Sequence, residues 1–182
     1  MIKLNAPLVQ EDVMKLKIGD QVLLSGVIYT ARDAAHQKLV DLLKAGKELP
    51  FNPQGSVIFY VGPSPAKPGQ VIGAAGPTTS YRMDPFVSDL LKVGMKGMIG
   101  KGPRSQEVKD GIVTYNGVYF GATGGAAALL AKTITEAEVI AFPELGPEAV
   151  RRLVVKDMPL IVVNDCHGDD LYEKGVKDFQ KD

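Results

Sequence analysis

The sequence predicts an α/β domain, and three observations support this. Short apolar, β-prone runs recur along the chain, and several are continuous, as in strands buried on both faces. Segments with the helical period of apolar residues lie between them. The chain has 182 residues, of which 45% are hydrophobic and 23% charged, values typical of one ordinary globular domain spanning residues 1–182. Alternating strands and helices favour the α/β class, but they do not give the strand order.

Eight runs are expected to form strands. They are rich in β-branched, aromatic or small apolar residues, and turn residues bound most of them. In chain order they cover residues 22–24, 27–29, 57–61, 97–100, 112–115, 118–120, 137–142 and 160–163. The stretch VGPSPAKPGQ, residues 61–70, is typical of a surface loop because of its prolines and glycines.

The first predicted helix covers ARDAAHQKLVDLLKAG, residues 31–46. Its alanines and leucines fall on one helical face, and Gly46 stands where a C-terminal stop belongs. Thr30 precedes this helix as the expected N-cap. Asp33 follows three residues later, which is the spacing of a capping box.

A second helix is expected over DPFVSDLLKVG, residues 84–94. Asp84 is its expected N-cap, Pro85 occupies the first helical position, and Gly94 is the stop. These start and stop signals make it the best-delimited helix in the sequence.

Three further segments are candidates for short helices. GGAAALLAKT, residues 124–133, is apolar enough to be largely buried. GPEAVRRLVVKD, residues 146–157, has Pro147 near its start. A third helix follows the glycines of IGKGP, and Arg104 is assigned to its solvent-facing surface, where Arg104→Lys would change little.

Composition excludes several classes of partner and site. The 21 basic and 21 acidic residues give zero net charge, which removes the electrostatic basis for binding nucleic acid or a membrane surface. No long apolar run or signal-peptide pattern is present, so we expect a cytoplasmic protein without a membrane span. The single cysteine, Cys166, allows no disulfide within the chain and no iron–sulfur site built from its own thiolates.

Basic residues stand at three places where a predicted strand is followed by a helix. Arg32 lies in the first turn of the helix at 31–46, Arg82 lies just before the next helix, and Lys101 follows the run at 97–100. A cation in a first turn faces the positive end of the helix dipole, at a cost of roughly 0.3–1 kcal/mol. Taken alone, Arg32 is better explained by solvation or by pairing with a nearby acid than by a bound anion. Three such junctions in a neutral domain predict one shared anion site at the carboxyl edge of the sheet.

The stretch GPTTSYRMD, residues 76–84, adds three hydroxyl groups to this predicted anion site. GATGG, residues 121–125, offers backbone N–H groups through its glycines. Neither GMKGMIGKG nor GKGPRS has the spacing of a P-loop or of a dinucleotide fingerprint. The planar fork of arginine binds both oxygens of a carboxylate. Two arginines and a lysine with hydroxyls between them therefore indicate a small dicarboxylate.

Each of the two histidines has two interpretations. His36 lies about one turn after Arg32 on the same helical face. It is either a buried, hydrogen-bonded core residue or an orienting or proton-transferring group. His167 belongs to DCHGDD, residues 165–170, which we interpret as a turn after the strand at 160–163. The sequence has no second cluster of histidine or cysteine to complete a metal site, so no metal ligand is assigned in this chain.

The chain resembles the C-terminal, or β-subunit, part of class I fumarate hydratases in five motifs: TARDAAH, GPTTSYRMD, IGKGPRS, GGAAALLA and FPELGPEAV. The L-tartrate dehydratase β subunit is a close relative of these iron–sulfur hydro-lyases. The resemblance runs from about residue 18 to about residue 172. It implies the swivelling β/β/α fold of that family, with a mixed sheet.

The resemblance also implies an enzyme that works only with a partner subunit. That α subunit would hold a four-iron–four-sulfur cluster with three cysteines, and the open iron would act on the substrate as a Lewis acid. An α2β2 assembly is implied. The implied reaction is the reversible hydration of fumarate to (S)-malate, in which this chain binds the dicarboxylate and moves a proton.

Motif by motif, the resemblance assigns substrate binding to Arg32, Thr78, Arg82 and Lys101. It also makes Thr78 the proton-abstracting group and His36 an active-site residue. A free alcohol is a poor base, so Thr78 would need the help of Arg82 and of a dry pocket.

Two alternatives to a fumarate hydratase stay open. In NDCHGDD, residues 164–170, the His-Gly pair resembles the tartrate relatives, whereas fumarase relatives tend to have Asp-Asp-Lys-Gly-Asn-Asp there. GKGPRS and GGAAALLA are more similar to the fumarases and favour fumarate and malate. The alternative from another functional class is a non-catalytic module that binds a dicarboxylate.

Overall fold

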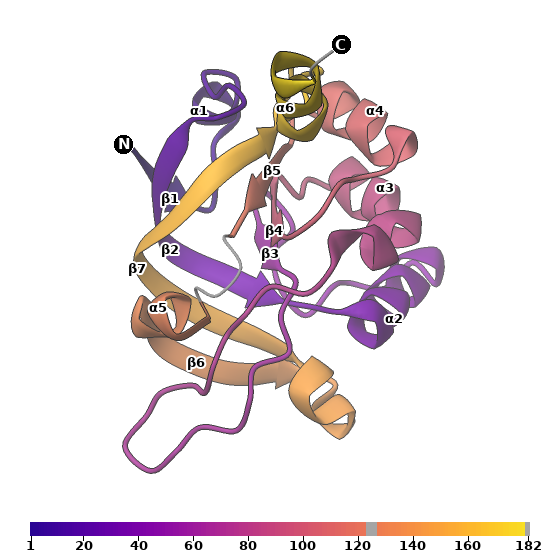
Figure 1. The fold of residues 1–182 in the computed structure, drawn as a ribbon. Helices are drawn as coiled ribbons and strands as arrows, with labels where there is room; N and C mark the ends of the chain where they lie inside the picture. The colour runs from indigo at the N-terminus through magenta and orange to yellow at the C-terminus, as the bar shows by residue number, and fades with distance from the viewer. Residues whose placement is uncertain (123–126, 181–182) are drawn as a thin grey trace.

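The computed structural model describes residues 1–122 and 127–180 (Figure 1). Within this part seven strands form one sheet: β1 (Ile2–Ala6), β2 (Gln21–Thr30), β3 (Val57–Phe59), β4 (Gly97–Gly100), β5 (Val118–Gly121), β6 (Ile134–Ala141) and β7 (Val150–Asn164). The order is β1-β2-β3-β4-β5-β7-β6, with β1 to β5 parallel and β7 antiparallel to its neighbours. The predicted α/β class with a mixed sheet is confirmed.

Strand β7 closes this sheet. It is 15 residues long and pairs with β2 along one edge and with β6 and then β5 along the other. Because β2 also pairs with β3, the strands β2, β3, β4, β5 and β7 form a closed circuit of neighbours. The run predicted as a strand at residues 160–163 is the last part of β7.

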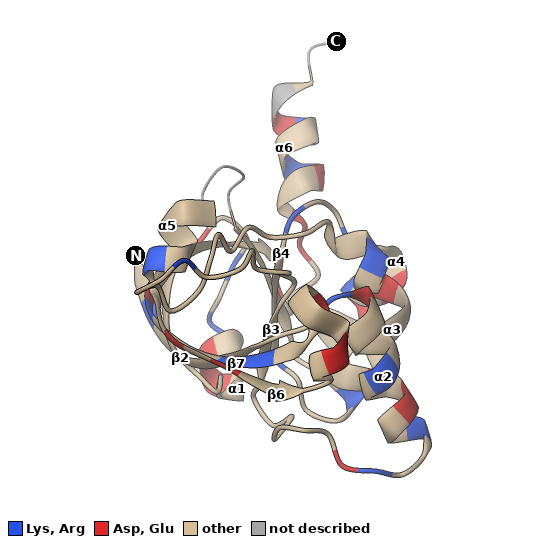
Figure 2. Ribbon diagram, turned by 90° about the horizontal axis from the view of Figure 1, so that it is seen from below, with Lys and Arg blue, Asp and Glu red and all other residues tan. Residues whose placement is uncertain are grey.

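The larger helices lie on one side of this circuit. α2 (Asp33–Lys44), α3 (Asp84–Lys92) and α4 (Gln106–Thr114) pack side by side, as Figure 1 shows. The shorter elements are α1 (Gln10–Val13), α5 (Ala127–Lys132) and the 3-10 helices η1 (Ser80–Met83) and η2 (Pro143–Glu148). α6 (Leu171–Phe179) extends away from the body of the molecule (Figure 2). No helix among the described residues is long and apolar enough to cross a membrane.

Two buried apolar clusters hold the layers together. Leu24, Phe59 and Phe120 belong to the cluster within the strand circuit. Ile58 belongs to the other, where it meets helix residues such as Leu90. Adjacent residues of β3 therefore enter different clusters, which explains why its sequence is continuously apolar.

Residues 112–115, predicted as a strand, form the C-terminal end of α4 and the residue after it. The Oγ of Ser105 caps this helix by accepting the backbone N–H of Val108 at 3.3 Å. Val108 and Ile112 are buried at helical spacing in the cluster between the helices and the strands. A four-residue apolar run fits either period, and packing beside α3 favours the helix.

The helix predicted over residues 146–157 is also wrong. η2 ends at Glu148, and β7 begins at Val150. Leu153 and Val155 are buried with the period of a strand, and this part of β7 pairs with β2 and with β6. Pairing on both edges outweighs the local helix signal of Pro147.

Strand β2 is continuous over the runs predicted as 22–24 and 27–29. Gly26 joins them at a register shift, with a φ of 103°. A Cβ added there would lie 2.3 Å from the backbone oxygen of Ala6, so the close approach of β1 requires glycine. The other predicted strands correspond to β3, β4, β5 and β6 with small changes at their ends.

The predicted helix stops are confirmed, and the predicted N-caps are wrong. Gly46 and Gly94 follow α2 and α3 with φ of 66° and 117°, in the left-handed region that favours glycine. The Oγ1 of Thr30 donates to the backbone oxygen of Ala149 at 3.2 Å instead of capping α2. Asp84 is the first residue of α3 and makes no cap bond. Both side chains make long-range contacts, which here outweigh a cap worth about 1 kcal/mol.

The turn predicted at residues 165–170 is confirmed. The Oδ1 of Asp165 accepts the backbone N–H of His167 at 3.0 Å and of Asp169 at 3.2 Å. The glycines at residues 124–125, predicted to begin a helix, lie outside the described residues, and the helix beyond them is α5. The prediction that this helix is largely buried is wrong: within α5 only Leu130 is buried, and Leu129 is 55% exposed, because one side of this short helix faces solvent.

Candidate active site

The predicted substrate-binding residues lie at the carboxyl ends of parallel strands. Arg32 follows β2, and Lys101 follows β4. The segment 78–82 returns to the same edge after the long loop that follows β3 (Figure 1). There the N–H of Thr78 donates to the oxygen of Tyr60 at 2.7 Å, and the N–H of Ser80 donates to the oxygen of Lys101 at 2.9 Å. The backbone itself therefore places the hydroxyl-rich segment between the ends of β3 and β4.

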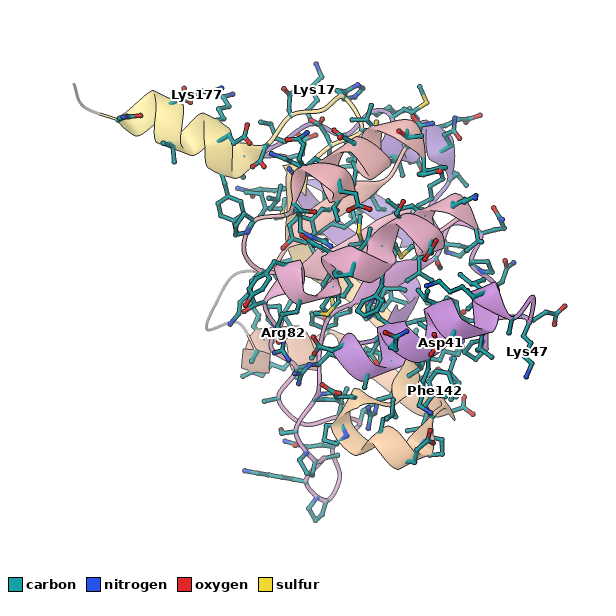
Figure 3. The ribbon with its side chains drawn as sticks, turned by 90° about the vertical axis from the view of Figure 1, so that its right-hand side faces the viewer. Lys17, Asp41, Lys47, Arg82, Phe142 and Lys177 are labelled. Carbon is teal, nitrogen blue, oxygen red and sulfur yellow. The ribbon has the colours of Figure 1, made fainter. Side chains whose placement is uncertain are left out.

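An ion-pair group joins the two arginines. The Nε of Arg82 lies 3.0 Å from the Oδ1 of Asp33, and the Nη2 of Arg32 lies 3.7 Å from its Oδ2. Arg32 also pairs with Glu148 at the end of η2, where Nη2 and Oε1 are 3.1 Å apart. Asp33, predicted to complete a capping box, serves these arginines instead. Figure 3 shows Arg82 near the N-terminal end of α2, which carries Asp33.

The pairing of Arg32 with acids agrees with the simpler of its two interpretations. Gly62 makes room for this side chain, because a Cβ there would lie 3.0 Å from the Nη1 of Arg32. The side chain of Arg32 is 23% exposed and that of Arg82 is 45% exposed. Lys101 is exposed as well. All three cations therefore reach the surface at one edge of the sheet, where an anion can meet them.

Arg104 is buried, which contradicts its assignment to the helix surface. Its guanidinium has no exposed area, and its Nε donates to the Oδ1 of Asp84 at 2.8 Å. The Oδ2 of Asp84 accepts the N–H of Ser105 at 2.7 Å. The guanidinium also lies over the rings of Tyr60 and Tyr119, at 5.3 and 4.8 Å from their centroids. Burial acts to lower the pKa of Arg104, but Tyr60 and Asp84 outweigh it, so this pKa is raised and the charge is kept.

A pair of hydroxyl groups connects the segment that carries Arg82 with the turn that carries Lys101. The Oγ of Ser80 lies 2.8 Å from the Oη of Tyr119, and that hydroxyl donates to the oxygen of Gly102 at 2.9 Å. Burial raises the pKa of Tyr119, so its hydroxyl stays protonated as a donor. A Cβ at Gly100 would lie 1.9 Å from the Oγ of Ser80, so this contact requires glycine. Together with Asp84 and Arg104, these bonds hold the segment with Arg82 against the turn with Lys101.

His36 lies in the core behind Arg32. It is fully buried, its Nδ1 lies 2.9 Å from the backbone oxygen of Arg32, and its ring meets the edge of Tyr60 at 5.3 Å between centroids. Burial lowers the pKa of His36 to about 4, so the ring is neutral at pH 7 and its Nδ1–H donates to Arg32. This geometry suits an orienting residue, and a part for His36 in proton transfer stays a prediction.

His36 also predicts a pH dependence of stability. Because its pKa is lowered from 6.5 to about 4 on folding, the unfolded chain binds this proton more tightly. Stability should fall as the pH falls from about 6.5 to about 4, by up to roughly 3 kcal/mol. Denaturant unfolding at pH 7 and pH 4.5 measures the slope, and His36→Asn should flatten it. Equal slopes for the two proteins would contradict the assignment to His36.

The described residues do not fit an iron–sulfur cluster. Within residues 1–122 and 127–180, no group of three His, Cys, Asp or Glu side chains could hold a metal ion. The one cysteine of the sequence, Cys166, is buried, with its Sγ 3.9 Å from the backbone oxygen of Val13. Burial raises the pKa of this thiol, which disfavours the thiolate that a metal needs. No reaction step is therefore assigned to a cluster held by this chain.

Sequence reasoning missed the acids and the tyrosines of this site. Asp33 is adjacent to Arg32 in the motif TARDAAH, and that adjacency was the available signal. Tyr60 and Tyr119 stand inside apolar runs that were predicted only as strands. A buried tyrosine near the end of a strand needs a hydrogen-bond partner for its hydroxyl group. That need was the available signal for a buried polar side chain such as Arg104.

Comparison with known proteins identifies the family of this chain. The family model described as Fumarase C-terminus matches residues 1–175. A protein of Methanocaldococcus jannaschii, provisionally named L(+)-tartrate dehydratase subunit beta, is 42% identical over 173 residues, covering 92% of this chain and 89% of that protein.

Two fumarate hydratases are also similar. Fumarate hydratase 2 of Leishmania major is 40% identical over 91% of this chain, and the anaerobic class I fumarate hydratase of Escherichia coli K12 is 39% identical over 96%. The chain spans only about a third of these two proteins, 30% and 33% of their length. The names of all three relatives are those of enzymes that add or remove water. With a family match over nearly its whole length, this chain belongs to the fumarase C-terminus family.

Proposed function

We propose that this chain is the β subunit of an iron–sulfur-dependent hydro-lyase that reversibly hydrates fumarate to (S)-malate. The observation behind the proposal is that Arg32, Thr78, Arg82 and Lys101 come to one edge of the sheet in a chain of this family. In this proposal the arginines and the lysine bind the two carboxylates of the substrate. Residues 1–182 would form a single β-subunit domain with the swivelling β/β/α fold.

The proposed division of labour gives the cluster to a partner. This chain has one cysteine, whereas a four-iron–four-sulfur cluster needs several thiolates. An α-type subunit would hold the cluster, which supplies a Lewis acid, and the two chains would assemble as α2β2. Exposure of Arg82 and Lys101 supports this, since charged groups bind a substrate far better once a second surface excludes water from them.

Thr78 is the proposed proton-abstracting group. Its backbone is held by Tyr60, and its side chain is half-buried beside the segment with Arg82. An alcohol is a weak base, so the reaction needs the positive charge of Arg82 and a closed, dry pocket to favour the alkoxide. Covering of this edge by the partner would provide that pocket.

The substrate could instead be tartrate, because the relative from M. jannaschii is a separate β subunit of similar length. His167, the sequence feature that kept tartrate open, does not support that choice. Its Nε2 lies 3.0 Å from the backbone oxygen of Met14, beside α1. The motifs GKGPRS and GGAAALLA, which are more similar to the fumarases, keep fumarate and malate as the proposed pair.

One assay tests the proposal. The chain is co-expressed with an α-type partner under anaerobic conditions, the cluster is reconstituted, and malate, tartrate and citramalate are offered for dehydration. Turnover of malate that exceeds the other two supports the proposal, and faster turnover of tartrate replaces it with the tartrate dehydratase alternative. Dicarboxylate binding by the complex without any turnover would favour a non-catalytic binding module.

The isolated chain is expected to bind no iron–sulfur cluster and to show no hydratase activity. The reason is its single cysteine, which cannot supply the thiolates. Iron and sulfide analysis after reconstitution, with an ultraviolet assay for fumarate, makes the measurement. A stoichiometric cluster on this chain alone, together with turnover, would contradict the proposed division of labour.

A further inference from the structure

Asp33 lies between the two arginines of the candidate site. Its Oδ1 is 3.0 Å from the Nε of Arg82, and its Oδ2 is 3.7 Å from the Nη2 of Arg32. The side chain of Asp33 is 29% exposed, and its Oδ2 is shielded from water without a hydrogen-bond partner among the described residues. One carboxylate thus faces two guanidinium groups that would otherwise repel each other.

The contact to Arg82 is made through Nε, and this determines which edge of the guanidinium is left for a ligand. A guanidinium has five N–H groups, and its two terminal nitrogens form a fork that matches both oxygens of a carboxylate. The nearest contact of Asp33 is to the Nε of Arg82, and among the described residues Nη1 and Nη2 donate no hydrogen bond, so the fork can meet such a ligand.

The backbone that carries Asp33 is held at the start of α2. Asp33 is the first residue of α2, where a negative charge is favoured by the helix dipole. The backbone oxygen of Arg32, next to it, accepts both the N–H of His36 at 2.8 Å and the Nδ1–H of His36. The start of the helix is therefore held from the core side.

We propose that Asp33 is a positioning residue, which holds Arg82 by its Nε and so directs the terminal fork toward a carboxylate of the substrate. The inference rests on the proposed function for the identity of the substrate, and on the geometry of this chain for the rest. Asp33 itself is not expected to touch the substrate.

The first test uses the isolated full chain and needs no activity. The Nε–Hε signal of Arg82 is identified by NMR through its loss in Arg82→Lys. In Asp33→Asn this signal should shift, because the charged partner at 3.0 Å from Nε is gone. Asp41→Asn is the matched control: it removes the same charge from the same helix, at a side chain bonded to Gln37 and distant from Arg82 (Figure 3). An unchanged Arg82 signal in Asp33→Asn would overturn the proposal.

The second test uses the assembled enzyme. Asp33→Asn should lower kcat/KM by about 10- to 100-fold, mainly by raising KM, because a mispositioned fork binds the carboxylate less well. Asp41→Asn should stay within about twofold of the parent. In an Arg82→Lys background, Asp33→Asn should lower kcat/KM by less than a further factor of about three, since Asp33 acts through Arg82. An equal loss in both backgrounds would overturn the proposal.

Circular dichroism and cluster content serve as controls in both tests. If Asp33→Asn folds poorly, Asp33→Glu replaces it, because one added methylene displaces the carboxylate from Nε. If the parent assembly converts none of the hydroxy acids, the proposed function is contradicted. The NMR test would still decide the role of Asp33.

Discussion

Arg82→Lys in the assembled enzyme is expected to lower kcat/KM strongly, although lysine keeps the positive charge of the arginine. In the proposed function the arginine has separate groups for two partners: Nε lies beside Asp33, and the terminal fork would bind the substrate. A lysine has one nitrogen, which Asp33 would draw away from the substrate. A lost charge-assisted bond costs roughly 1.5–3 kcal/mol, or about 10- to 150-fold, and misplacement of the substrate by ~1 Å adds up to ~100-fold.

Steady-state kinetics with malate makes this measurement, with iron content and circular dichroism to show that assembly and fold are unchanged. Arg152→Lys is the matched control, because Arg152 pairs with Glu136 at 3.4 Å on the exposed side of β6 and β7. This surface pair should contribute little. Near-normal kcat/KM for Arg82→Lys would mean that Arg82 is structural and that GPTTSYRMD is only the start of a helix.

Arg104→Met is expected to be the most destabilising of these substitutions. It leaves Asp84, whose side chain is only 11% exposed, without its buried positive partner. Breaking a buried pair in this way costs about 3–5 kcal/mol, because the remaining charge is poorly hydrated. For a chain of this size, that corresponds to a fall in Tm of roughly 6–20 °C.

Arg104→Lys, predicted to be mild when Arg104 was assigned to the surface, should also destabilise the chain. Lysine keeps the charge but loses the planar contact to the rings of Tyr60 and Tyr119. Thermal unfolding of the isolated chain by circular dichroism measures both variants beside Arg152→Lys. A loss below about 1 kcal/mol for Arg104→Met would show that the pair behaves like an exposed one.

The sequence by itself determined the fold class, the two well-delimited helices and the candidate site residues. These predictions rest on local physics: the period of apolar residues, the left-handed conformation of Gly46 and Gly94, and the geometry of arginine as a carboxylate ligand. Parallel strands end at one edge, so residues after β2 and β4 meet there without further information. Arg82 was placed at this edge because it stands just before a predicted helix.

Only the tertiary structure decided the identity of the ambiguous segments. Residues 112–115 and 150–157 each have apolar residues that suit either a helix or a strand, and local sequence does not distinguish them. Packing beside α3 makes the first a helix, and pairing with β2 and β6 makes the second part of β7. Partners that lie far away in the sequence determine both outcomes.

Burial of charge was likewise decided only by the fold. Arg104 follows a glycine turn, where a surface position is the ordinary expectation, yet Asp84, Tyr60 and Tyr119 come together around it. Asp33 has the spacing of a capping box and instead faces Arg82. A charged side chain tolerates burial or an off-pattern position only where opposite charges surround it, and which charges surround it depends on contacts between distant segments of the chain.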